Sequence, residues 1–451
     1  MTTPQVSKAD ADLWLAYGVK LKNTFAQSIT LSGNNRFYVA PLSYAGIAAG
    51  TKVNPAITNN GVYVIGDSLL SLDEPVFLPG QQSYFQRCLS YANSVDLHSD
   101  KNIGAKLQYN DAQRAAQAAQ KSYQDVKYTA IAAWKQDVTD QITSDSFPQW
   151  CIQNYPKLTW AQTSSRAATA AAAAASSALD DPMAPIVSQY QSSLNAANGI
   201  TAIPGADQIS SGQAGTPDAP LERPAYTIPA QYPQVVDGWI NTFTQNSKTP
   251  TTITFKASDA SSSSWQDLGH SNDTVRVTAP YCIFFSATYT ENNVTVTKNV
   301  TAEEAGAELE VTITATGFQS FPITPGNWDP SQLAGLPIVA DADPNLSKPM
   351  AVVNQAILAY GVGMEVKLSS SAASTINNYM DKASSSGGRA SIFGFNIGLG
   401  GDANSTQTST TTFDQVKDAS SSTIFTIPPS DNSNPTLLGV FGQAIPLPKK
   451  T

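Results

Sequence analysis

GAKLQYNDAQRAAQAAQKSYQDVKYTAIAAWKQDVTDQIT, residues 104–143, is the longest stretch of this chain with neither a proline nor an internal glycine. Small or apolar residues recur in it at alternating spacings of three and four: Tyr109, Ala112, Ala116, Ala119, Tyr123, Val126, Ala130 and Ala133. This heptad seam predicts a helix about 60 Å long, at about 1.5 Å per residue. Alanines in the seam let a partner helix approach closely, and we expect the glutamines mostly on the outside: Gln113, Gln117, Gln120, Gln124 and Gln136.

The partner is expected in the alanine-rich segment 159–180, where Ala167 to Ala175 is interrupted only by Thr169. The two segments, about 104–145 and 159–180, predict an antiparallel helical hairpin. Residues 147–157 contain Pro148 and Pro156 and are expected to form the turn region between them. Residues 1–198 are predicted to form a helical domain, in which short apolar runs such as 37–39 and 62–65 are expected to be short strands or irregular loops.

The second half of the chain has a different pattern. Residues 199–234 are rich in proline and glycine and predict a linker or a wrapping arm. Apolar residues then alternate with polar ones, as in Ile253 and Phe255, Val275 and Val277, and Leu309, Val311 and Ile313. This pattern predicts an antiparallel β-sandwich over 235–330. It also predicts that residues 331–451 form a second β-rich part, packed on the sandwich or continuous with it. The predicted class is α+β.

The composition is low in charge. Charged residues make up 14% of the chain, against about 25% in an ordinary soluble protein. The net charge of −9 argues against nucleic-acid binding and against polybasic docking on anionic membranes. A surface rich in Ser, Thr, Asn and Gln has short side chains and weak charge repulsion, and it therefore favours self-association.

Few residues suit metal or redox chemistry. The chain has two histidines, His98 and His270, so we expect neither a metal site of the His/Cys kind nor a cofactor. Its three cysteines are far apart and odd in number: Cys88, Cys151 and Cys282. They are expected to be free thiols in a reducing compartment, and an intermolecular disulfide is the alternative.

The chain begins with a polar segment, without the apolar core of a cleavable signal, and has no run of about 18 to 20 apolar residues. We therefore expect an intracellular, cytoplasmic protein. Five glycosylation sequons occur, and whether any is used stays open; they begin at Asn272, Asn293, Asn299, Asn345 and Asn404.

Two short motifs contain candidate catalytic residues. Gly66-Asp67-Ser68-Leu69 follows an apolar run, and Asp267-Leu268-Gly269-His270 contains an Asp-x-x-His pair. Together they resemble the first and last blocks of the GDSL family of esterases and lipases. The resemblance implies Ser68 as nucleophile, His270 as general base and Asp267 as the group that orients it. The alternative is a turn in which Asp67 or Ser68 caps the next segment.

Three function classes follow. The hypothesis we favour is a non-enzymatic, self-associating structural or assembly protein whose partner is itself, because catalytic residue types are scarce. The first alternative is a pore-forming or membrane-acting protein, since the Ser/Thr-rich residues 384–426 resemble in composition the membrane-inserting stems of β-pore-forming toxins. The second alternative is a GDSL-like ester hydrolase that uses Ser68, Asp267 and His270.

Overall fold

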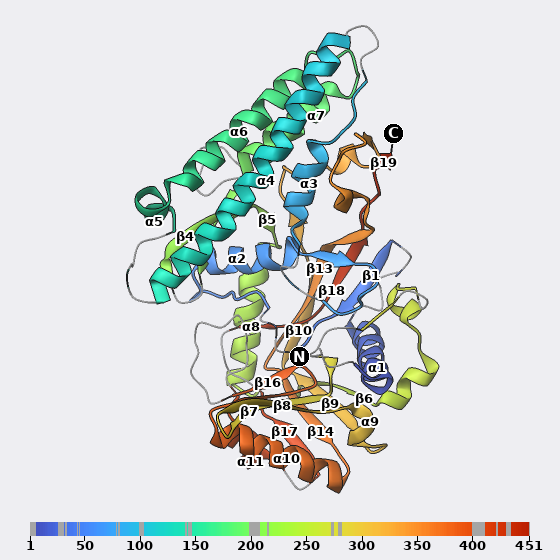
Figure 1. Cartoon of the computed structure of the whole chain (residues 1–451). Helices are drawn as coiled ribbons and strands as arrows, with labels where there is room; N and C mark the ends of the chain where they lie inside the picture. The colour runs from blue at the N-terminus through green and yellow to red at the C-terminus, as the bar shows by residue number, and fades with distance from the viewer. Residues whose placement is uncertain are drawn as a thin grey trace.

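The computed structural model describes residues 6–25, 31, 34–42, 44, 46–77, 79, 82–98, 103–139, 142, 147–197, 208–213, 216–271, 275–277, 282–398, 411–420, 423–429 and 434–450. They form helices and mainly antiparallel sheets, which confirms the predicted α+β class. Figure 1 shows a layer of long helices at one end of the molecule, an extended sheet in the middle, and smaller sheets with short helices at the other end.

The helical layer is built from α4 (Ile103–Thr139), α5 (Phe147–Asn154), α6 (Pro156–Ser176) and α7 (Ala184–Ala197). Late residues of α4 share a small core with the start of α6, as Trp134 does with Leu158. Earlier in α4, Gln120 accepts a hydrogen bond of 2.7 Å from Ser165, further along α6. The two long helices therefore run antiparallel (Figure 1).

The expected turn region 147–157 is mostly helical. Pro148 lies in the first turn of α5, and Pro156 is the first residue of α6. At those positions a helix has no partner for the backbone N–H that proline lacks, so proline begins a helix there and does not break one. The prediction from proline alone was therefore wrong for this segment.

The glutamines of α4 differ from the expectation as well. Gln113 and Gln120 are buried, at 1% and 8% exposure, because α3 (Tyr84–Ala92) and the residues after it cover a second side of α4. Gln113 Nε2 donates to the carbonyl of Val95 at 2.7 Å. Gln120 Nε2 donates to Gln86 Oε1 at 2.8 Å. The two amides thus donate hydrogen bonds to the Val95 carbonyl and to Gln86 Oε1. Alanine at these two positions would leave both acceptors without these donors.

The central sheet has five strands. Its order is β1 (Asn35–Val39), β18 (Thr436–Ala444), β13 (Met350–Tyr360) and β10 (Gly317–Pro322), and β2 (Leu69–Ser71) also pairs with β13. All of these pairings are antiparallel. Residues 1–198, predicted to be a helical domain with short strands or loops, thus supply two strands to a sheet whose other strands come from the C-terminal half. Local periodicity does not reveal such long-range pairing.

The central sheet separates two cores. In β18, Leu438 and Phe441 belong to one core, which includes Trp14 and Phe393. Leu437 and Val440 belong to the other, which lies toward the helical layer and includes Trp328. Because both faces of β18 are covered, its side chains from Thr436 to Gly442 are all buried, and the strand reads as a continuous apolar run.

Two further sheets have four strands each. One is β17 (Ile424–Ile427), β14 (Gly363–Lys367), β9 (Glu310–Ala315) and β6 (Thr251–Phe255). The other is β16 (Phe395–Ile397), β15 (Arg389–Ile392), β7 (Phe285–Glu291) and β8 (Val294–Val300), with α10 (Ser370–Ser385) packed against it. Residues of the segment 384–426 thus form short strands of these sheets, and residues 399–410 lie outside the described part of the chain.

The remaining elements are short: α2 (Pro55–Gly66), β3 (Gln208–Gln213), β4 (Thr216–Pro224), β5 (Tyr226–Thr227), α8 (Tyr232–Thr244), α9 (Ala302–Ala305), β11 (Thr324–Pro325), β12 (Pro337–Ile338), α11 (Phe413–Ala419) and β19 (Lys449–Lys450). Two expectations need correction: the apolar run 62–65 belongs to a helix, and residues 275–277 form no strand. The proline-rich region 199–234 contains β3, β4 and β5. Within the described residues, no helix is both long enough and apolar enough to cross a bilayer.

The N-terminal helix α1 (Lys8–Phe25) connects the sheets. Leu13, Tyr17 and Leu21 follow one another at a spacing of four residues on one face of this helix and are fully buried. Asp10 is buried too, and its Oδ1 accepts hydrogen bonds from the backbone N–H groups of Phe284, at 3.0 Å, and Ala302, at 2.9 Å. The first turn of α1 is thereby fixed to the segments before β7 and after β8.

Candidate functional site

Ser68 lies just past the end of α2, not at the end of a strand as the GDSL resemblance implies. Its side chain is 1% exposed, and its Oγ donates to the carbonyl of Val64 at 2.7 Å. A nucleophilic serine needs access to substrate and a base within hydrogen-bond reach. The position of Ser68 fits a helix end packed into the core.

The neighbouring Asp67 has a structural role. Its Oδ1 accepts hydrogen bonds from the backbone N–H of Phe85, at 2.8 Å, and from the Tyr226 hydroxyl, at 2.7 Å. Burial raises the pKa of Asp67, and the hydrogen bonds that the carboxylate accepts oppose that rise. The N-cap of α3 is Ser83, and Asp67 accepts a second backbone N–H of the first turn of that helix, which joins α3 to α2.

His270 and Asp267 have separate partners. The His270 ring is 1% exposed, with Nε2 2.9 Å from the carbonyl oxygen of Phe37 and Nδ1 3.4 Å from that of Leu72. Asp267 Oδ2 accepts a hydrogen bond of 2.7 Å from the backbone N–H of Ser264, at the start of its own short helix. With both histidine nitrogens beside backbone carbonyls, the geometry does not bring Ser68, His270 and Asp267 together as a triad.

Acid is expected to destabilise the protein through His270. Burial lowers the pKa of His270 from 6.5 to about 4. The unfolded chain therefore takes up the proton first, so the stabilisation is present above pH 6.5 and is lost as the pH falls toward 4. Between pH 7 and pH 5 the free energy of unfolding should fall by about 2 kcal/mol from this group.

Urea unfolding at the two pH values, on wild type and on His270→Gln, measures this contribution. The comparison is needed because Asp67 and Asp329 have raised pKa values and change stability in the opposite sense. The difference in unfolding free energy between the two proteins should change by about 2 kcal/mol from pH 7 to pH 5. Equal pH dependence in the two proteins would contradict the buried neutral histidine.

The three cysteines are free and buried, at 4% exposure for Cys88 and 0% for Cys151 and Cys282. Burial raises the pKa of each thiol, which keeps it in the unreactive protonated form. A disulfide between copies would therefore need local opening around a cysteine. In the described part of the chain, no three His, Cys, Asp or Glu side chains are grouped so that they could hold a metal ion.

A groove on the helical layer is the candidate interaction site. It has a volume of about 490 Å³ and lies between α4 and α6. Its residues are Ala119, Ser122, Val126, Pro156, Lys157, Trp160, Ala161 and Ser164. Trp160 is 81% exposed, the most exposed of the large apolar side chains described. The sequence signal for this site was a single tryptophan among alanine and hydroxyl residues, which periodicity alone did not distinguish.

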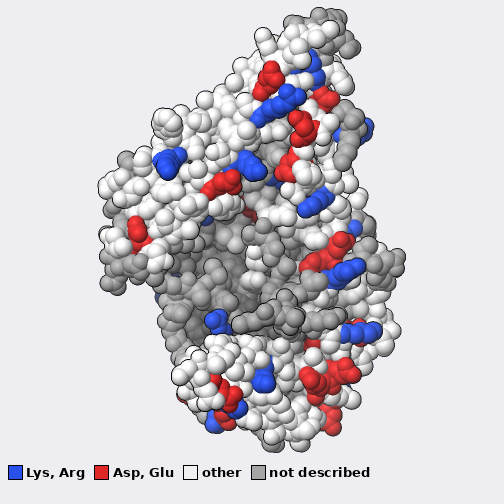
Figure 2. All heavy atoms as spheres, viewed as in Figure 1, with Lys and Arg blue, Asp and Glu red and all other residues white. Residues whose placement is uncertain are grey.

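Other exposed apolar side chains lie near this groove in the chain. Of the nine large ones among the described residues, five fall between residues 103 and 160: Ile103, Leu107, Tyr128, Ile142 and Trp160. Figure 2 shows that charged side chains on the visible face are scattered singly or in small groups between uncharged residues. The helical layer is thus the part of the described surface where apolar groups concentrate.

Comparisons with known proteins identify no relative: no family model and no curated protein matches the sequence, and no solved structure matches the fold.

Proposed function

We propose that this protein acts by self-association, and that two copies meet through the groove between α4 and α6. The observation that carries the proposal is the exposure of Trp160, at 81%, on the edge of that groove. Tryptophan is enriched among the interface residues that contribute most of the binding energy. Contact with a second copy would remove its apolar surface from water.

The groove is suited to a second copy because it contains both a large apolar side chain and small side chains against which such a side chain can pack. Small side chains, Ala119, Ser122, Ala161 and Ser164, lie in the same groove as the large ring of Trp160. In a two-fold contact the same patch serves both partners, so each Trp160 can lie over the small residues of the other copy. Close approach of the helices follows from those small side chains.

Low charge supports the same contact. Lys157 is the one charged residue among the eight that line the groove, so few ions lose hydration when the surfaces meet. The whole chain is only 14% charged, which lowers the repulsion between copies at close range.

Light scattering on the size-separated protein over a range of concentrations tests the proposal. Wild type should form dimers or larger species as the concentration rises. Trp160→Ser should weaken the association about 30-fold, the effect of losing about 2 kcal/mol at a central interface residue. Ser122→Arg, which places a long charged side chain in the groove, should weaken it as well.

The matched control is Tyr128→Ser. This residue is 67% exposed on α4 but is not one of the groove residues, and its loss should leave the association within about threefold of wild type. A wild-type protein that stays monomeric at high concentration overturns the proposal. So does association that is unchanged in both groove variants, or that occurs only when lipid vesicles are added.

A further inference from the structure

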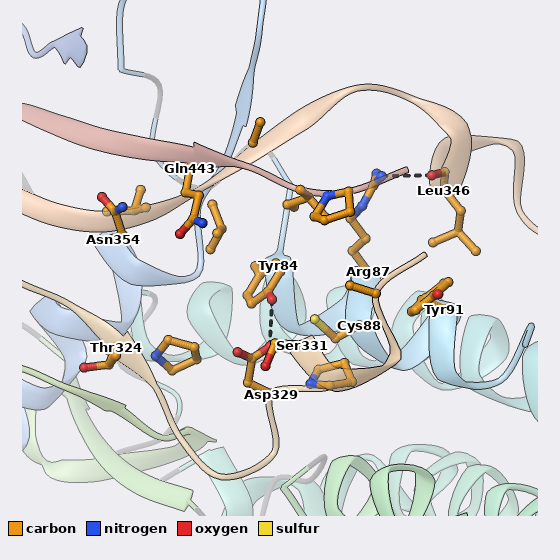
Figure 3. A pocket seen from close by; sticks show the side chains of 18 of the residues that line it. Tyr84, Arg87, Cys88, Tyr91, Thr324, Asp329, Ser331, Leu346, Asn354 and Gln443 are labelled. Atoms are coloured by element: carbon orange, nitrogen blue, oxygen red, sulfur yellow. Dashed lines mark hydrogen bonds between the residues drawn. The ribbon is translucent and has the colours of Figure 1, made fainter. Parts of the chain in front are cut away.

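A cavity of about 430 Å³ lies between α3, the strand β13, the end of β18 and the loop after β11 (Figure 3). It is separate from the groove on the helical layer, with which it shares no lining residue. Cavities of about 300 to 1,000 Å³ with apolar walls and a few polar groups are typical sites for small molecules. The size of this cavity falls in that range.

The walls of the cavity are mainly apolar. Ile323 comes from the segment before β11, Val352 and Val353 come from β13, and Ile445 and Pro446 follow β18. Leu346 closes another side. These side chains come from segments far apart in the sequence, and they leave space between them that apolar ligand atoms can fill.

One partly buried hydrogen bond defines the polar end of the cavity. The Tyr84 hydroxyl donates to Asp329 Oδ1 at 2.7 Å, and Figure 3 shows the two side chains facing each other at the cavity. No described residue donates a hydrogen bond to the second oxygen, Oδ2. Burial raises the pKa of Asp329, and the bond from Tyr84 opposes that rise. Because Asp329 is partly buried, its attraction to a cation is screened less by water and salt than that of a carboxylate on the open surface.

No described cation pairs with this carboxylate. The ion pairs of the described residues do not include Asp329. Arg87 also lines the cavity, but its guanidinium donates to the carbonyls of Asn345, Leu346 and Lys348, at 2.8, 2.9 and 3.0 Å. Figure 3 shows Arg87 directed toward Leu346. Its charge is thus bound by backbone oxygens.

A second acceptor lines the cavity without a partner. Asn354 Oδ1 is buried and has no hydrogen-bond partner among the described residues. Asp329 Oδ2 and Asn354 Oδ1 are both hydrogen-bond acceptors without a donor among the described residues. A ligand that complements either of them therefore has to carry a hydrogen-bond donor. The carboxylate favours a cationic donor, because a hydrogen bond between two charged groups is stronger than one from a neutral hydroxyl to a carboxylate.

We propose that this cavity binds a small amine with an apolar body, whose ammonium group donates to Asp329 while the body lies against Ile323, Val352 and Ile445. The Tyr84 hydroxyl holds the carboxylate in place through Oδ1 and leaves Oδ2 for the ligand. This site is independent of the proposed self-association and requires no covalent step.

Titration calorimetry with three probes that differ only in their polar group tests the proposal: 4-phenylbutylamine, 4-phenylbutanol and 4-phenylbutyrate. The amine should bind at least about tenfold more tightly than the other two, the ratio expected for a hydrogen bond to a charged group. Asp329→Asn should reduce the affinity for the amine to that for the alcohol. Ala334→Trp, at an exposed lining position, should abolish the binding of the amine by closing the cavity.

Asp341→Asn is the matched control, because Asp341 is an exposed carboxylate that pairs with Arg114 on the surface. It should leave the affinity for the amine unchanged. Thermal unfolding of each variant checks that it is folded. No amine binding at millimolar concentration overturns the proposal, as does tighter binding of the carboxylate probe. Amine binding that is equal in wild type, Asp329→Asn and Ala334→Trp overturns it too.

Discussion

Replacing Asp10 with alanine should lower the free energy of unfolding by about 4 kcal/mol. The Asp10 carboxylate is fully buried and accepts hydrogen bonds from the backbone N–H groups of Phe284 and Ala302 and from the hydroxyl of Ser7. Alanine would leave those two buried N–H groups without a partner, and each such group costs about 1 to 3 kcal/mol. The fixed position of α1 against the segments around β7 and β8 would be lost with them.

Asp12→Ala is the control for this variant. Asp12 lies on the same helix, but it is partly exposed and pairs with Lys8 at 2.6 Å on the surface. Its removal should change the unfolding free energy by no more than about 0.5 kcal/mol. Urea unfolding followed by circular dichroism measures both variants. Similar losses for the two would mean that the buried carboxylate contributes no more than a surface charge.

Replacing Trp328 with alanine should also cost about 4 kcal/mol, within the range for deleting a large buried aromatic side chain. Trp328 is fully buried in the core toward the helical layer, with ring centroids 5.0 Å from Phe85 and 5.3 Å from Tyr226. Its Nε1 donates to the carbonyl of Ala225 at 2.9 Å. The variant loses the packing of the ring and leaves that carbonyl without its donor.

Trp160→Ala is the matched comparison, because it removes the same side chain from an exposed position. Under conditions where the protein is monomeric, its unfolding free energy should stay within about 0.5 kcal/mol of wild type. Urea unfolding of both variants at the same protein concentration gives the two values. Equal losses for Trp160 and Trp328 would contradict the burial that separates them.

Much of the helical part could be predicted from the sequence. The heptad seam of residues 104–143 predicted a helix, and its members Tyr109, Ala116, Tyr123 and Ala130 are fully buried in α4. A repeat over many turns places one set of side chains on one face, whatever covers that face. The sequence did not reveal that a second side of the helix is also covered, which is why the buried Gln113 and Gln120 were misplaced.

Short apolar runs were less informative. Residues 62–65 suggested a short strand or an irregular loop, but they lie in the last turns of the helix α2. That helix begins at Pro55, and its N-cap Asn54 accepts a hydrogen bond from Ala56 N–H at 2.9 Å. Four apolar residues do not distinguish a strand from a buried helix turn. The motif around Ser68 consequently follows a helix. The candidate interaction residue, Trp160, became evident only from its exposure.

By itself, the sequence determined the α+β class, the location of the long helices and the scarcity of histidine and cysteine, because these follow from composition and from periodicity within short windows. Only the tertiary structure decided that residues 35–39 pair with residues 439–443, that Asp67 binds the first turn of α3, and that Tyr84 meets Asp329 across 245 residues of chain. Such contacts depend on how the whole chain packs, since each is chosen among many partners of similar local character.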